Sequence, residues 1–105
     1  MSGSGDFSIG STVWPGTSKV LEELGELQQV LGKLIATAGA EQHWDGSNLR
    51  DRIVEEIGDV VAALTLFETL NMTDDECRRV GDRALLKVAT FQAWHERQMK
   101  REVPA

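Results

Sequence analysis

The chain has 105 residues, of which 41% are hydrophobic, so it has room for one domain with a modest core. Its formal net charge of −6 argues against a protein that coats nucleic acid, because neutralising phosphates requires clustered Lys and Arg. Its apolar runs are shorter than the ~18 residues of a membrane-spanning helix, and its N-terminus lacks the features of a signal peptide. We therefore expect a cytoplasmic protein that binds neither membranes nor a nucleic-acid polymer. The lone Cys77 excludes an intramolecular disulfide.

Residues 1–16 are rich in Gly and Ser and predict a flexible N-terminal arm. Thr17 or Ser18 then offers a side chain that can cap the start of a helix. Apolar residues recur at helical spacing from there to Gly39, which predicts a first helix. The repeating positions are Leu21, Leu24, Leu27, Leu31, Leu34 and Ile35. The polar stretch 39–47 contains two glycines and predicts a loop.

Two further helical patterns follow this loop. One covers about residues 48–70, and the next begins at Thr73, because Thr73 and Glu76 have the spacing of a capping box. No segment shows the alternation of a β-strand. The sequence therefore predicts an all-α fold with three main helices, formed by a domain of residues 17–99 and followed by a C-terminal tail of residues 100–105.

The second helix is expected to be apolar over a wide arc, since Val54 and Val61 extend its stripe beyond one side. Three helices of this length enclose little volume by themselves. A helix that is apolar over so much of its circumference requires neighbours on two sides. We therefore expect a homodimer or homotetramer in which copies share a four-helix-type core.

Four acidic residues occupy unusual positions on the first two helices. On a helical wheel, Glu23 lies inside the apolar stripe of the first helix and Glu26 lies at its border. Glu56 lies near the middle of the apolar arc of the second helix, and Asp59 lies on its flank. A carboxylate on a buried face is costly unless it is paired, and the inward faces of these helices are expected to carry neither Lys nor Arg.

A divalent cation can provide the missing compensation. Residues three apart on a helix are neighbours, so each helix presents a pair of carboxylates. Two such pairs on facing antiparallel helices would form a cage of oxygen ligands, which favours Mg²⁺ or Mn²⁺ over zinc or copper. Either acidic pair taken alone is more often a solvated helix surface; the matched pair favours the metal.

The two acidic segments also have nearly the same sequence, Glu-Glu-Leu-Gly-Glu at 22–26 and Glu-Glu-Ile-Gly-Asp at 55–59. Glycine within a helix is unfavourable, so Gly25 and Gly58 predict close approach of a backbone or a ligand. This pattern of ExxE, a spacer and ExxD resembles the signature of the MazG-like, all-α nucleoside triphosphate pyrophosphatase superfamily. The resemblance covers about residues 19–70 and, more loosely, the third helix.

The resemblance implies that the chain hydrolyses a nucleoside triphosphate, (d)NTP, to the monophosphate and pyrophosphate with Mg²⁺, for which Mn²⁺ is a possible substitute. It implies that Glu23, Glu26, Glu56 and Asp59 hold the metal. Glu22 matches an acid that some members place near the attacking water, so Glu22 and Glu23 are the catalytic candidates. The alternative role for Glu22 is that of a surface acid.

Members of this superfamily also carry Lys, Asn or Arg after ExxD to bind phosphates. By resemblance the candidates are Lys87 and Arg83 in the third helix and Asn71 at the end of the second. Each of the two cations has a solvated surface residue as its alternative reading. Trp44 in the loop, or Trp14 in the arm, is a candidate for stacking on the base, and an oligomer contact would explain an exposed Trp equally well.

Two other functions compete with this enzyme. One is a non-catalytic helical interaction or regulatory module, in which the acids serve only solubility. The other is a di-metal oxidoreductase bundle, which is disfavoured because the sequence has no Glu-x-x-His pair and no inward-facing His.

Overall fold

The computed structural model of the protein describes residues 14–41 and 48–102. Within these ranges the chain forms three α-helices and no β-strand, which confirms the all-α prediction. The helices are α1 (Thr17–Ala36), α2 (Leu49–Asn71) and α3 (Asp74–Glu102). Helix α3 continues through residues 100–102, which the sequence had suggested for a C-terminal tail. No helix in the described ranges combines the length and apolarity needed to cross a membrane.

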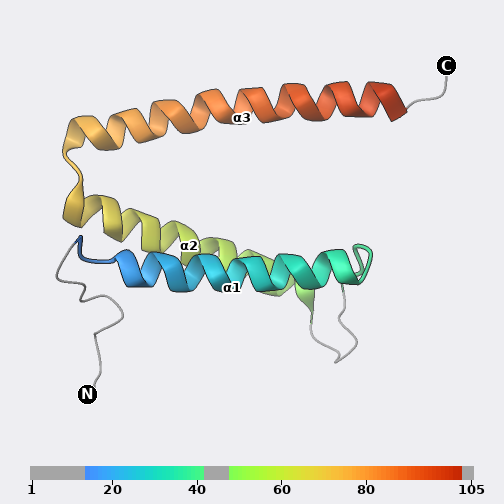
Figure 1. Cartoon of the computed structure of the whole chain (residues 1–105), viewed down its shortest axis with the longest axis horizontal. Helices are drawn as coiled ribbons and strands as arrows, with labels where there is room; N and C mark the ends of the chain where they lie inside the picture. The colour runs from blue at the N-terminus through green and yellow to red at the C-terminus, as the bar shows by residue number, and fades with distance from the viewer. Residues whose placement is uncertain (1–13, 42–47, 103–105) are drawn as a thin grey trace. The chain divides into compact units, whose positions relative to one another are not determined.

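The chain divides into two compact units, Met1–Asn71 and Met72–Ala105. The first unit contains α1 and α2, which lie side by side and run in opposite directions (Figure 1). Their packing places four apolar side chains in the core of this hairpin: Val30, Leu49, Val60 and Ala63. Burying a side chain such as Val or Leu contributes roughly 1.5–3 kcal/mol, so this core is small.

Many other apolar side chains of the hairpin remain exposed to solvent. The expected stripe of α1 and the wide apolar arc of α2 are both present, but only part of each is covered by the other helix. The exposed members are Leu21, Leu24, Leu31, Ile35, Val54, Ile57, Val61, Leu64 and Leu70.

Helix α1 begins differently from the prediction. Its N-cap is Gly16, with a left-handed φ of 94°, and neither Thr17 nor Ser18 caps the helix. The Thr17 hydroxyl instead donates a hydrogen bond to the backbone oxygen of Trp14, at 2.6 Å. The prediction of a Thr17 or Ser18 cap was wrong because contacts with α2 fix the preceding turn.

These contacts involve residues far apart in the sequence. The Trp14 ring stacks on Phe67, with ring centroids 5.8 Å apart. The Asn71 amide donates a hydrogen bond to the backbone oxygen of Pro15, at 2.8 Å. A side chain at Gly16 would lie against the Phe67 backbone and would also have to adopt the left-handed conformation. The turn at residues 14–16 is therefore held on the end of α2.

The other helix starts follow local sequence signals. The side-chain oxygen Oδ1 of Asn48 accepts a hydrogen bond from the backbone N–H of Asp51, as an N-cap side chain does. At α3 the Thr73 hydroxyl accepts from the Glu76 N–H, at 3.1 Å, and the Glu76 carboxylate accepts from the Thr73 N–H, at 2.9 Å. The predicted capping box is confirmed.

The second unit contains α3, in which none of the described residues is buried. Its apolar residues are spaced along the helix and are largely exposed: Val80, Leu85, Leu86, Val88, Phe91, Trp94 and Met99. Near its start, Arg78 and Arg79 form ion pairs with Asp75, and Arg78 also pairs with Asp82.

Candidate metal centre

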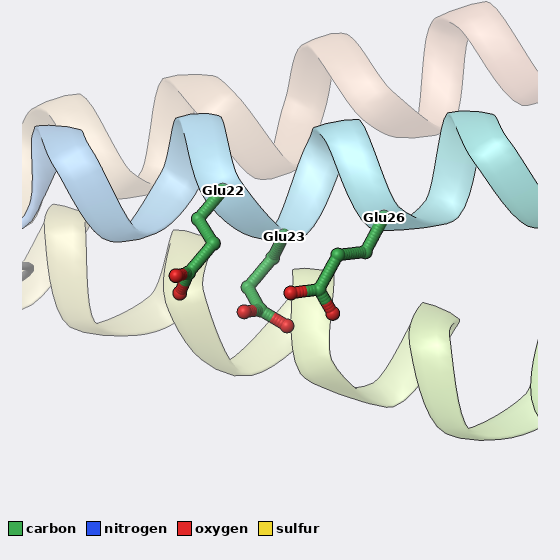
Figure 2. Close-up of side chains that lie close together, drawn as sticks. All are labelled: Glu22, Glu23 and Glu26. Carbon is green, nitrogen blue, oxygen red and sulfur yellow. The ribbon is translucent and has the colours of Figure 1, made fainter.

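Three carboxylates of α1 gather on one side of the helix. Glu22, Glu23 and Glu26 leave α1 in the same direction and their ends lie close together, as Figure 2 shows. One carboxylate oxygen from each lies within 4.8 Å of the others. The helix produces this arrangement because residues three and four positions apart are neighbours on its surface.

Glu23 also belongs to a second group, which joins the two helices of the hairpin. One carboxylate oxygen from each of Glu23, Glu56 and Asp59 lies within 4.8 Å of the others. Because α1 and α2 run antiparallel, the ExxE segment of one helix faces the ExxD segment of the other. Glu23 is common to both groups, so acids from two separate parts of the sequence meet at one place. We call these five residues, Glu22, Glu23, Glu26, Glu56 and Asp59, the acid cluster.

The members of the acid cluster differ in burial. Glu23 and Glu56 are partly buried, whereas Glu22, Glu26 and Asp59 are exposed. This order agrees with the wheel, which placed Glu23 and Glu56 inside their apolar faces. The Oε2 atom of Glu56 is buried and has no hydrogen-bond partner. A buried carboxylate oxygen without a partner loses its hydration without a compensating bond, which is unfavourable for the folded hairpin while Glu56 is ionised.

The pKa values of the two partly buried acids, Glu23 and Glu56, also indicate uncompensated negative charge. Desolvation by burial raises the pKa of Glu56, and the negative charges of Glu26 and Asp59 raise it further, while Arg52 opposes them. Burial also raises the pKa of Glu23, followed by the charges of Glu26, Asp59 and Glu22. Both partly buried acids therefore lie in a field of excess negative charge.

Lys19 lies beside the acid cluster, which the sequence did not predict. Its side-chain nitrogen donates a hydrogen bond to Glu22, and this contact lowers the pKa of the Glu22 carboxyl. The positive charge of Lys19 also acts on Glu23 and Glu26. The expectation that no cation would offset these acids holds only in part: Lys19 bonds to Glu22, and the positive charge of Arg52 acts on Glu56. These two cations offset less than half of the charge of five acids.

The spacing of Lys19 contained the signal that would have found it. Lys19 stands three positions before Glu22 and four before Glu23, and cations and acids at these intervals are neighbours on a helix. The position of Lys19 relative to the apolar stripe does not by itself indicate a contact with the acids.

A hollow of about 380 Å³ opens beside the acid cluster, between α1 and α2. Lys19 lines it from α1, and Glu23 and Asp59 line it from the two helices. Its remaining lining is apolar and comes from the small or medium side chains Ala62, Ala63 and Leu66. Ligand pockets have volumes of roughly 300–1,000 Å³, so the hollow has the size of a small one.

The glycines of the two acidic segments lie in open space. A side chain built on Gly25 or Gly58 meets no atom within 4 Å. The close backbone approach predicted for these glycines is therefore not found within the hairpin. The space beside them is open to a ligand or to another copy of the chain.

The remaining predicted site residues lie elsewhere. Asn71 is at the end of α2, about 18 Å along the helix from Asp59. Its amide donates to the backbone oxygens of Pro15 and Phe67, so both of its donor hydrogens are occupied. Trp44 lies outside the described residues.

Lys87 and Arg83 belong to α3, in the second unit. The Lys87 nitrogen lies 5.5 Å from the centre of the Phe91 ring, which is a cation–π contact within α3. Arg83 lines a separate hollow on the same helix with Met72, Glu76, Arg79 and Val80.

No protein-family model matches the chain, and comparisons with curated proteins and with solved structures found no match either. Function must therefore be inferred from the acid cluster.

Proposed function

We propose that the chain is a Mg²⁺-dependent nucleoside triphosphate pyrophosphohydrolase, which cleaves a (d)NTP to the (d)NMP and pyrophosphate. One observation carries this proposal: carboxylate oxygens of Glu23, Glu56 and Asp59, from two helices, lie within 4.8 Å of one another, and Glu56 has a buried oxygen without a hydrogen-bond partner. A cation would supply that partner and would offset the excess negative charge. The ligands offered are carboxylate oxygens alone, which suits Mg²⁺ or Mn²⁺.

In this proposal Glu23, Glu26, Glu56 and Asp59 hold the metal. When bound, the metal supplies charge neutralisation for the phosphates and lowers the pKa of a bound water. Glu22 is exposed at the edge of the cluster, and the contact with Lys19 lowers its pKa. Glu22 is therefore ionised at neutral pH. On the strength of the sequence resemblance, we assign it as the general base that accepts the proton of the attacking water.

Residues outside the acid cluster would bind the substrate. We retain Lys87 and Arg83 as proposed phosphate ligands and Trp44 as a proposed base-stacking residue, on the strength of the sequence resemblance. Asn71 is less suited to this role, because its amide hydrogens already bond to two backbone oxygens and fix the turn before α1.

We also propose that the enzyme is a homodimer or homotetramer. The exposed residues Leu24, Leu31 and Ile35 border a shallow hollow on α1, together with the half-buried Leu27, and both α2 and α3 expose further large apolar side chains. Large exposed apolar patches are rare on monomeric proteins, and a second copy would bury these side chains in a shared helical core.

Pyrophosphate release from a panel of dNTPs tests the catalytic assignment. With Mg²⁺ present, Glu56→Gln and Asp59→Asn should each reduce turnover by more than about 100-fold, since even residues one shell beyond a metal are typically worth 10–100-fold. Glu55→Gln is the matched control, because Glu55 is an exposed neighbour outside the acid cluster. Wild-type turnover in both cluster variants would contradict the proposal.

The exposed apolar surface also favours a second candidate, a non-catalytic helical interaction module. In such a module the acid cluster would bind no metal. Thermal unfolding with millimolar Mn²⁺ distinguishes the two, since only a protein that binds the ion in its folded state is stabilised.

A further inference from the structure

Lys19 occupies a position between the acid cluster and the neighbouring hollow. It lies in the first turns of α1, and its side chain is 29% exposed, compared with 47% for its partner Glu22. Lys19 lines the hollow together with Glu23 and Asp59. The Lys19 side chain therefore bonds to the Glu22 carboxylate and also borders the hollow.

The lining of the hollow is divided by chemistry. Glu23 and Asp59 supply negative charge, Lys19 supplies the positive charge, and Ala62, Ala63 and Leu66 are the apolar part of the lining. Among the described residues that line the hollow, Lys19 is the cation. An anion that enters this space beside the acids would be repelled by Glu23 and Asp59 unless a positive group stood against it.

Resting on the proposed function, we propose that Lys19 is a substrate-binding residue whose ammonium leaves Glu22 and donates to a phosphate oxygen of the (d)NTP in this hollow. Exchanging Glu22 for a phosphate is expected to be favourable. An exposed Lys–Glu pair contributes little free energy, and a polyphosphate attracts the ammonium more strongly because it carries more charge than one carboxylate. The flexible four-carbon stem of Lys permits the movement without a change in the helix.

This exchange links Lys19 to the proposed general base. When Lys19 donates to the phosphate, the Glu22 oxygen that accepted its hydrogen bond becomes free for another donor. The attacking water is such a donor. Substrate binding would thus free the acceptor at the moment when a triphosphate is in place.

Steady-state kinetics of Lys19→Met test the inference. Losing a hydrogen bond to a charged group corresponds to about tenfold or more in affinity, so KM for the dNTP should rise by that factor. The affinity for Mn²⁺ measured by calorimetry should be unchanged or higher, since a positive charge near the acids is removed. Lys33→Met is the matched control, because Lys33 lies in the last turn of the same helix, and its KM should stay that of the wild type.

Two further variants keep the result independent of folding defects. Lys19→Gln retains a hydrogen-bond donor without the charge and should show the same rise in KM, whereas Lys19→Arg should recover most of the wild-type value. An unchanged KM in Lys19→Gln or Lys19→Met, with Mn²⁺ binding intact, would overturn this inference and leave the proposed function standing. A wild-type protein that neither binds Mn²⁺ nor releases pyrophosphate would overturn both.

Discussion

The α1–α2 hairpin and α3 place their acidic residues in opposite settings. On α3, Asp75 and Asp82 are largely exposed and pair with Arg78 and Arg79 at 2.7–3.1 Å. In the hairpin, Glu23 and Glu56 are partly buried, their pKa values are raised, and one oxygen of Glu56 has no partner. Asp75 and Asp82 are neutralised by arginines of their own helix. In the hairpin, Lys19 and Arg52 offset only part of the negative charge around Glu23 and Glu56.

The sharpest test of this contrast is neutralisation of one acid in each region. Glu23 belongs to both groups of the acid cluster, so Glu23→Gln should abolish Mg²⁺-dependent pyrophosphate release, with a loss of more than about 100-fold. Asp82→Asn makes the same kind of change on α3 and should alter turnover by no more than about twofold, since surface substitutions have small effects. Equal losses in the two variants would show that the acid cluster has no special role.

Metal binding should also stabilise the hairpin. At a free Mn²⁺ concentration of about 100 times Kd, linkage predicts about 2.7 kcal/mol of added stability. The Tm measured by calorimetry should rise accordingly, return to its starting value with a chelator, and stay constant in Glu56→Gln. A Tm that rises as much in Glu56→Gln as in the wild type would place the stabilising ion elsewhere.

The raised pKa values predict how the metal-free protein responds to pH. The pKa values of Glu23 and Glu56 in the folded protein lie above 4.5, their value in the unfolded chain. Between 4.5 and the raised values, the folded state therefore carries more protons than the unfolded state. Stability therefore decreases as pH rises from about 4.5 through the raised values. Glu22 has the opposite sign, because its lowered pKa adds stability that is lost as pH falls below 4.5.

Urea unfolding at pH 5 and pH 8 measures this effect. Between pH 5 and pH 8, the metal-free wild type should lose more stability than Glu56→Gln loses, because the variant lacks one of the two groups responsible. Saturating Mg²⁺ should remove most of the wild-type loss at pH 8. A wild type that loses no more stability over this range than the variant does would contradict the assignment.

The smallest effect is expected on α3. Arg78→Ala removes two exposed ion pairs and should cost no more than about 1 kcal/mol in urea unfolding, since such pairs are typically worth 0.2–1 kcal/mol. Turnover should be unaffected. A loss of several kcal/mol would show that these surface ion pairs contribute as much to the free energy of unfolding as the hairpin core does.

The sequence predicted those parts of the fold that depend on local signals. Helical periodicity located all three helices, and Thr73 with Glu76 marked the start of α3 correctly, because a capping box is formed by residues three apart. The start of α1 was missed. Gly16 takes the cap position because Phe67 and Asn71, on another helix, hold the preceding turn, and no local pattern reports such a contact.

For the candidate site, too, the sequence predicted the features that depend on spacing along one helix. The wheel identified Glu23 and Glu56 as the inward acids, since direction on a helix follows from spacing. It also placed Glu26 and Asp59 at the border and the flank, where they are exposed. It did not reveal that Lys19 reaches the cluster, because the reach of a long side chain depends on the packed neighbour. The roles of Lys87, Arg83 and Trp44 stay predictions.

Anomalous diffraction from crystals grown with Mn²⁺ tests the central claim most directly. The account predicts one or more Mn²⁺ peaks within about 2.5 Å of carboxylate oxygens of Glu23, Glu56 and Asp59, with the unpaired oxygen of Glu56 among the ligands. Density that shows these three side chains turned apart, with no peak between them at millimolar Mn²⁺, would contradict it.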